Sequence, residues 1–210
     1  MRTRLIFVRH GESLHTADAV VGGRRGCRGL TATGHEQART LAGRFSDDLA
    51  ADGPVAVYSS TLRRAVETAQ PIAAAFATTP VQNCGLCTWH VPSYADGMPT
   101  SRFRADHAIA GGGVFRPFEE GNESWAELVV RTSRAITDIA HQHHGGTVVL
   151  VGHSETVESS FHALAAQPLY RAFDVQVAPA SITEWITDDH PTGWPPPRWT
   201  LCRFNDARCG

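Results

Sequence analysis

The sequence predicts an α/β fold: one domain of three layers, in which helices cover both faces of a mostly parallel, doubly wound sheet. Short apolar runs, too brief to be helices, alternate along the chain with longer segments of helical periodicity. The 210 residues suffice for one sizeable core, and no linker-like stretch divides them. We therefore expect a single domain over residues 1–210.

The first strand–helix unit is expected near the N-terminus. Residues 5–8 form an apolar run that predicts a buried strand. Residues 33–50 carry apolar side chains at helical spacing, and Thr31 or Thr33 is a suitable cap for this helix. The N-terminal apolar run is too short for a signal peptide or a membrane span, so we expect a soluble, cytoplasmic protein.

A second unit follows. Residues 55–60 predict another strand, and residues 61–76 predict a helix. Pro71 lies inside that helix, where a proline removes a backbone hydrogen bond, so we expect it to kink or shorten the helix. The region 80–121 is rich in Gly, Pro, Ser and aromatic residues and is expected to be an irregular, lid-like insertion.

Regular periodicity returns in the second half. Residues 123–144 predict a long helix. Residues 145–155 combine a glycine break with a buried strand, and residues 155–166 predict the next helix. Two late strands, around 181–186 and 199–204, are expected to complete the sheet.

Cationic side chains lie at the ends of three predicted strands. Arg9 and His10 follow the first strand, Arg63 and Arg64 begin the helix after the second, and His153 follows the strand of the second half. Ligands of doubly wound sheets bind outside the carboxyl ends of the strands. Guanidinium groups, imidazoles and helix N-termini together suit a phosphate ester, and neutral imidazole is a competent nucleophile near neutral pH.

Five segments carry a family resemblance. RHGES, LTATGHEQA, VYSSTLRRAVETA, GNES and VLVGHSE resemble, in this order, the signature segments of the histidine phosphatase superfamily, whose members are phosphoglycerate-mutase-like. The resemblance covers nearly the whole chain. It implies a histidine-type acid phosphatase, or phosphomonoesterase, that hydrolyses a small phosphorylated metabolite through a phosphohistidine intermediate, with no metal or other cofactor.

The resemblance also implies residue roles. His10 matches the nucleophile that becomes phosphohistidine, and Arg9 matches the first arginine that clamps the phosphoryl group. Arg64 matches the second such arginine, whereas Arg63 occupies a variable position and is expected to point elsewhere. His153 matches the second catalytic histidine, which binds the phosphoryl group.

Two positions depart from the family pattern. Thr16 stands where many members have asparagine, and Thr88 stands where the general-acid glutamate is expected if Leu86 is the matching leucine. A general acid contributes about 10²–10⁴-fold to a rate, or about 3–5 kcal/mol. We favour Glu155 as the substitute acid, because it follows His153 by two residues at the same edge; the alternative is a carboxylate that only complements a helix dipole.

Other groups in the insertion are also candidate acids: Asp96, His90 and His107. The missing glutamate leaves a second class of function open as well. A non-hydrolytic relative, either a phosphate-ligand binding protein or a biosynthetic enzyme, would reuse the same phosphate site for other purposes. Mutase activity is the less favoured enzymatic alternative, because nothing in the sequence indicates a site closed against water.

Charge excludes some partners and leaves the substrate open. A formal net charge of −2 argues against nucleic-acid or anionic-membrane binding. All 19 basic residues are arginines, so any phosphate site is built from guanidinium and imidazole groups. Residues that could meet the rest of a small phosphorylated substrate are Arg24, Arg25, Arg28, Trp89, His90 and Tyr94. The sequence does not indicate the oligomeric state.

The cysteines do not form a disulfide framework. Their number, five, is odd, and Cys84 and Cys87 form CGLC, which suits a redox pair or half of a zinc site. Further zinc ligands would have to come from Cys202, Cys209 or scattered histidines. We expect buried free thiols instead. The histidines in HQHH at 141–144 are expected to serve a helix end rather than a metal.

Overall fold

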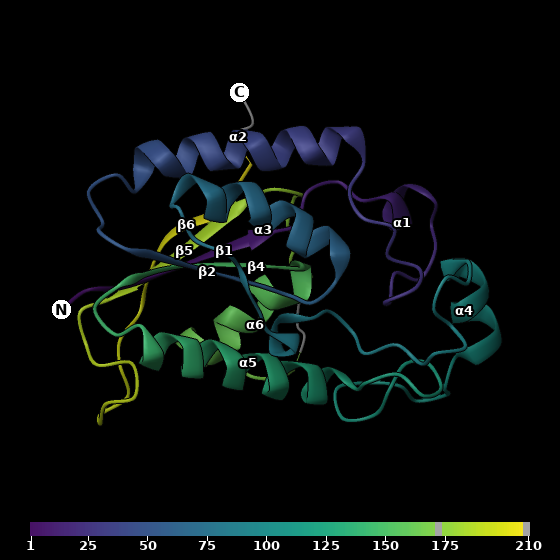
Figure 1. Ribbon diagram of the computed structural model, residues 1–210. Helices are drawn as coiled ribbons and strands as arrows, with labels where there is room; N and C mark the ends of the chain where they lie inside the picture. The colour runs from purple at the N-terminus through teal and green to yellow at the C-terminus, as the bar shows by residue number, and fades with distance from the viewer. Residues whose placement is uncertain (171–173, 208–210) are drawn as a thin grey trace.

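The computed structural model describes residues 1–170 and 174–207, which form a three-layer α/β/α structure around a six-stranded sheet (Figure 1). In spatial order the strands are β3 (Val81–Gln82), β2 (Val55–Ser59), β4 (Thr147–Gly152), β1 (Thr3–Arg9), β5 (Ile182–Thr187) and β6 (Thr200–Asp206). On one face lie α2 (Ala32–Asp48) and α3 (Arg63–Ala75), and on the other lie α5 (Trp125–Gln142) and α6 (Ser154–Ala165). The predicted fold class is confirmed.

Strand direction divides the sheet into two parts. β1 and β2 both pair in parallel with β4, and β3 pairs in parallel with β2. β5 runs antiparallel to β1, and β6 runs antiparallel to β5. The carboxyl ends of β1, β2 and β4 therefore meet at one edge of the sheet, where Arg9, Ser59 and Gly152 end their strands.

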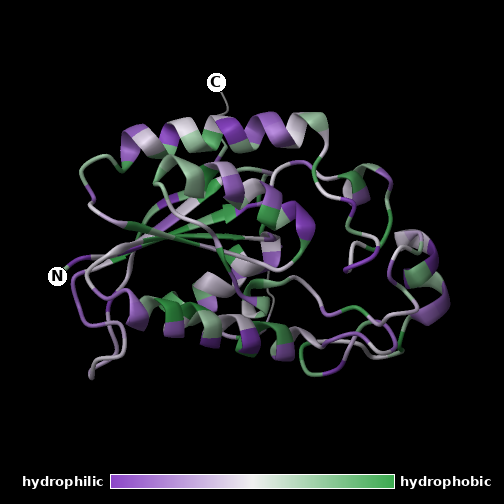
Figure 2. Cartoon of the chain, viewed as in Figure 1, coloured by the Kyte–Doolittle hydropathy of each residue, from purple (hydrophilic) through white to green (hydrophobic). Residues whose placement is uncertain are grey.

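Alternating side chains of β1 supply two separate cores. Ile6 and Val8 are fully buried with residues of α2 and α3. Leu5 and Phe7 are fully buried against α5 and α6. In Figure 2 the strands are mainly hydrophobic, whereas the outer helices alternate between hydrophobic and hydrophilic residues. A continuous apolar run thus becomes a strand buried on both faces.

The first two long helices begin close to the predicted positions. Thr31 caps α2, and its side chain accepts a hydrogen bond from Gly34 N. Of the kink or shortening expected at Pro71, the shortening does not occur, because α3 continues past Pro71 to Ala75. A proline inside a helix costs about 3 kcal/mol. Burial of Ile72, about 1.5–3 kcal/mol, and of the neighbouring alanines of α3 offsets that cost.

The region 80–121 is less irregular than predicted. It contains β3, the 3₁₀ turn Cys84–Leu86 and a helix, α4 (Thr100–His107). A short helix that the sequence analysis did not predict, α1 (Leu14–Ala17), lies near α4 beyond the sheet (Figure 1). Val21 N donates to Met98 O at 2.8 Å, so the loop after α1 is joined to the segment before α4.

A small separate core stabilises this joined region. Val21, Ala95 and Phe103 are buried together there. The two loops therefore pack as one unit beside the carboxyl ends of the parallel strands.

None of the helices among residues 1–170 and 174–207 is both long enough and apolar enough to span a bilayer.

Candidate active site

The turn after β1 places His10 at the edge of the sheet. Gly11 N donates to Thr68 Oγ1 of α3 at 3.1 Å. A Cβ atom at Gly11 would lie 2.7 Å from Gly34 O, so only glycine allows this turn to approach the start of α2. The turn is thereby held between two helices.

His10 is held as a neutral imidazole with a defined tautomer. Its ring is 4% exposed, and its Nδ1 lies 2.7 Å from Gly11 O, to which Nδ1–H donates. Nε2 therefore carries the lone pair, and it accepts a hydrogen bond from Arg64 Nε at 3.1 Å. Burial, and then the charge of Arg64, hold the pKa of His10 well below its usual value.

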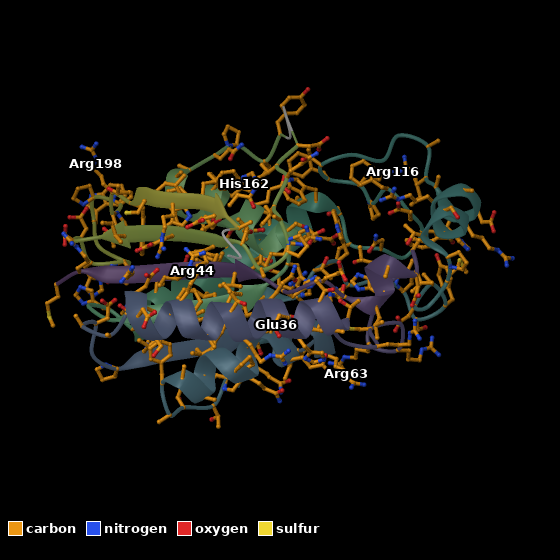
Figure 3. All side chains as sticks on the ribbon, turned by 90° about the horizontal axis from the view of Figure 1, so that it is seen from above. Glu36, Arg44, Arg63, Arg116, His162 and Arg198 are labelled. Atoms are coloured by element: carbon orange, nitrogen blue, oxygen red, sulfur yellow. The ribbon has the colours of Figure 1, made fainter. Side chains whose placement is uncertain are left out.

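The two consecutive arginines of α3 lie in different environments. Arg64 is 2% exposed and donates from NH1 to Gly22 O at 2.8 Å, in addition to its contact with His10. Arg63 points away from this cluster, and Figure 3 labels it at the periphery of the molecule. Its side chain is 67% exposed and forms a 2.6 Å ion pair with Glu67.

His153 faces His10 from the neighbouring strand. It follows β4 and caps α6, and its backbone N donates to Thr156 Oγ1 at 2.9 Å. The ring centroids of His10 and His153 lie 5.1 Å apart, and His153 Nε2 lies 2.9 Å from Ser60 Oγ. Burial, and then the charge of Arg64, keep the pKa of His153 well below its usual value.

Two buried nitrogens at this edge are suited to an anion. Arg9 Nε and His153 Nδ1 have no hydrogen-bond partner within the described ranges. Arg9 donates from NH1 to Val177 O, and burial lowers its pKa. A buried polar group without a partner costs about 1–3 kcal/mol. A phosphoryl group bound between these nitrogens would satisfy both.

A carboxylate lies beside the cationic cluster. Glu155, in the first turn of α6, accepts a 3.0 Å hydrogen bond from Thr88 Oγ1. Burial lowers the pKa of Arg9, and the nearby charge of Glu155 offsets only part of that lowering. Glu155 and Thr88 line a cavity of about 550 Å³ that also exposes Arg64 and His15.

The other candidate acids of the insertion have different partners. Asp96 accepts from the backbone N of Arg25 and of Gly26, each at 2.7 Å, and so fixes a loop. The His107 ring packs against Tyr94 at a centroid distance of 4.7 Å, with the two rings tilted by 45°. None of these side chains lines the cavity that contains Glu155.

Sequence reasoning missed two residues of the site. His15 of α1 has its ring centroid 6.1 Å from that of His10, and burial lowers its pKa to about 4. Thr16, at the family's asparagine position, is exposed, with Oγ1 3.4 Å from His15 Nε2. Ser60 contacts His153 and accepts a hydrogen bond from Leu62 N at 3.1 Å. The sequence signal for His15 was its closeness to RHGES, and that for Ser60 was its place inside the VYSSTLRRAVETA segment.

Residues expected to contact the rest of a substrate are divided between two places. Arg24, Arg25 and Trp89 line a second cavity of about 480 Å³, and Trp89 also lines the cavity of Glu155. Arg28 instead forms an ion pair with Asp18. Tyr94 is occupied by a 2.6 Å hydrogen bond from its hydroxyl to Glu120 O.

The chain is similar to known proteins over most of its length. The family model of the histidine phosphatase superfamily (branch 1) matches residues 5–199. A metal-independent phosphoserine phosphatase of Arabidopsis thaliana is 30% identical over 196 residues, which cover 89% of this chain and 80% of the relative. A phosphoglycerate mutase-like protein of the same plant is 29% identical over 171 residues, covering 75% of this chain and 69% of the relative.

Two solved structures share the fold. A mycobacterial glucosyl-3-phosphoglycerate phosphatase in complex with VO₃ superimposes with a TM-score of 0.77 at 22% identity, covering 97% of this chain and 99% of that chain. A phosphoserine phosphatase of Entamoeba histolytica, in complex with 3-phosphoglyceric acid, gives a TM-score of 0.71 at 22% identity and covers 97% of each chain.

Proposed function

The chain belongs to the histidine phosphatase superfamily and is a phosphomonoesterase, and from this premise we propose that it works through a phosphohistidine formed at His10. The observation that carries the proposal is the pair of hydrogen bonds on the His10 ring. Nδ1–H donates to Gly11 O at 2.7 Å. The lone pair of Nε2 therefore points towards Arg64, whose Nε lies 3.1 Å away. This is the arrangement of a neutral nitrogen nucleophile.

The first chemical step transfers the phosphoryl group to the enzyme. His10 Nε2 forms a bond to phosphorus while the bond from phosphorus to the ester oxygen breaks. Glu155, in its protonated form, gives a proton to that leaving oxygen. The alcohol departs, and the enzyme holds a phosphohistidine and an ionised Glu155. Thr88 keeps the carboxyl group in place through its 3.0 Å hydrogen bond.

The second step returns the enzyme to its starting form. Glu155 takes a proton from a water molecule, whose oxygen attacks phosphorus. The bond from phosphorus to His10 Nε2 breaks, and inorganic phosphate leaves. Through both steps Arg9, Arg64 and His153 stabilise the charge on the phosphoryl oxygens, so the reaction requires no metal cation.

The substrate is a small phosphorylated metabolite. The cavity beside Glu155, about 550 Å³, is of the size that encloses small ligands. Its lining combines apolar rings, such as Phe103 and Phe118, with polar groups on Arg104 and Asn122. The region 80–121 contributes most of these residues and serves as a lid over the strand ends. Phosphoserine and 3-phosphoglycerate, which occur in the names of relatives, are the first substrates to assay.

Other assignments have less support. The relative that is 30% identical is a phosphoserine phosphatase, so a non-hydrolytic role is not favoured. A mutase would have to retain the phosphoryl group, and the cavity of Glu155 is open to solvent.

The four described cysteines are unpaired, as suits a reducing compartment, so we place the reaction in the cytoplasm.

The decisive experiment traps the intermediate. Wild-type enzyme quenched during turnover of ³²P-labelled phosphoserine should carry acid-labile phosphate, and His10→Ala should carry none. His107→Ala, which changes a histidine packed against Tyr94 away from His10 and His153, is the matched control and should label like wild type. Acid-labile phosphate on His10→Ala would show that another group is the nucleophile.

A further inference from the structure

A cluster of soft ligands lies beside the phosphate site, where Ser60 Oγ, which contacts His153, also donates to Cys87 Sγ at 3.4 Å. Cys84 Sγ, Cys87 Sγ and a ring nitrogen of His90 all lie within 4.8 Å of one another. The spacing is C-x₂-C-x₂-H, in the segment CGLCTWH. Because Cys84–Leu86 is a 3₁₀ turn, residues three apart project from the same side, which brings the two thiols together. The sequence left the further ligands open among Cys202, Cys209 and the histidines, and His90 is the one that lies beside the two thiols.

We propose that Cys84, Cys87 and His90 form a binding site for Zn²⁺, with three protein ligands and one open position. Zinc bonds of about 2.3 Å to sulfur and about 2.0 Å to nitrogen give a sulfur–nitrogen edge of about 3.5 Å in a tetrahedron. Cys84 Sγ lies 3.5 Å from His90 Nε2. Two thiolates also balance the charge of the cation.

The orientation of His90 is set by a second layer of contacts. His90 Nδ1 lies 3.5 Å from Glu123 Oε1, and the His90 backbone N donates to Glu123 Oε2 at 2.9 Å. Histidine ligands of zinc commonly donate their other ring nitrogen to a carboxylate, which fixes the tautomer. Glu123 therefore leaves Nε2, the nitrogen next to Cys84, to bind the metal.

Arg131 holds both halves of the cluster. Its Nε and NH2 donate to the two carboxylate oxygens of Glu123 at 2.9 and 2.8 Å. Its NH1 also donates to the carbonyl oxygens of Cys84 and Cys87, at 3.2 and 3.0 Å. One partly buried guanidinium thus ties the cysteine turn to the carboxylate that orients His90. Such a preorganised second layer is typical of a metal site rather than of two incidental thiols.

The surroundings of the cluster leave room for a fourth ligand. Cys84, Cys87 and His90 line the cavity of about 480 Å³ that also contains Arg24 and Arg25. Three protein ligands facing a cavity leave one position of a tetrahedron accessible. Water or an anionic group held by the two arginines would occupy it. The three ligands line this cavity and not the neighbouring one that contains Glu155, so the phosphoryl transfer proposed above has no step at the metal.

The test measures metal binding directly. Full-length protein is reduced, freed of metal with a chelator, and titrated with Zn²⁺ against a chromogenic zinc indicator. Wild type should bind Zn²⁺ stoichiometrically, and Co²⁺ in its place should give the thiolate charge-transfer band and the intense visible bands of a tetrahedral site. Cys84→Ser and His90→Gln change exposed residues and should each weaken Zn²⁺ binding by at least about 100-fold.

Two further variants separate a built site from adventitious binding. Cys202→Ser removes an exposed thiol on β6 and should bind Zn²⁺ like wild type. Glu123→Gln should weaken binding by about 10-fold or more while the protein keeps its circular dichroism spectrum.

Two outcomes would overturn the proposal. One is that reduced wild type takes up no Zn²⁺, whether or not the fresh protein carried a Cys84–Cys87 disulfide. The other is that uptake persists in Cys84→Ser and His90→Gln. Because none of these readouts depends on turnover, failure here leaves the proposed phosphatase mechanism untouched.

Discussion

Thr88 Oγ1 donates a 3.0 Å hydrogen bond to Glu155 Oε2. Members of the superfamily commonly have a glutamate at the position of Thr88. Glu155 lies on a different element, in the first turn of α6. The contact between them brings a carboxyl group to the same wall of the cavity. In the proposed mechanism the general acid is therefore on the helix after His153 and not in the loop after the 3₁₀ turn.

If Glu155 is the acid, its loss should affect substrates unequally. Glu155→Gln should slow hydrolysis of an alkyl phosphate by about 10²-fold or more, because the alkoxide then leaves without a proton. Hydrolysis of p-nitrophenyl phosphate should change much less, since its leaving group departs as a stable anion. Steady-state kcat on both substrates checks this.

The partner of Glu155 provides a second variant. Thr88→Val keeps the shape of the side chain and removes the hydrogen bond, so it should reduce kcat on the alkyl phosphate less than Glu155→Gln does. Equal slowing of both substrates by Glu155→Gln would remove Glu155 from the role of proton donor.

Arg63 and Arg64 form a matched pair for testing the phosphate clamp. Arg64→Lys should weaken competitive inhibition by inorganic phosphate by about 10-fold or more, because lysine cannot replace a guanidinium that contacts His10 and, in the proposed mechanism, also binds the phosphoryl group. Arg63→Lys should change the inhibition constant by less than about 2-fold, since exposed ion pairs contribute little. Similar losses in both variants would contradict the assignment.

The histidine cluster makes folding stability depend on pH. Burial, with repulsion from Arg64 and Arg9, lowers the pKa of His15 to about 4, below the value of about 6.5 in an unfolded chain. Between pH 4 and pH 6.5 the unfolded chain is protonated at His15 and the folded chain is not. The contribution of His15 to the free energy of unfolding is therefore complete above about pH 6.5 and is lost as the pH falls towards 4.

Replacing His15 should therefore flatten part of this dependence. His15→Asn should lose less of its free energy of unfolding than wild type between pH 7 and pH 5, as measured by guanidinium denaturation. His107→Asn is the control: the His107 ring packs against Tyr94, away from Arg9 and Arg64, so this variant should retain the wild-type slope. A His15→Asn slope equal to that of wild type would show that the site does not hold this imidazole neutral.

Two adjacent serines at the end of β2 should respond in opposite ways. Ser60→Ala removes the group 2.9 Å from His153 Nε2 and should cost about 1–3 kcal/mol of stability, together with activity. Ser59 Oγ is buried without a partner in the described part of the chain, so Ser59→Ala should be neutral or stabilising. Denaturation midpoints and kcat/KM measure both effects. A more harmful Ser59→Ala would mean that the roles of the two hydroxyls are reversed.

Much of the site could be predicted from the sequence, because its main residues lie next to strands. Buried strands are recognisable as short apolar runs, and parallel strands place their carboxyl ends at one edge of a sheet. Arg9, His10, Arg64 and His153 follow such runs directly or open the next helix, and the structure brings them together. Their convergence is a consequence of local patterns combined with one rule of topology.

The contacts across loops were decided by the tertiary structure alone. The apolar patterns of β5 and β6 did not show that these strands run antiparallel, because periodicity carries no information about strand direction. The pairing of Thr88 with Glu155 joins residues 67 positions apart. Such contacts depend on the path of the insertion over the sheet edge, which is set by long-range packing and not by any local preference of the chain.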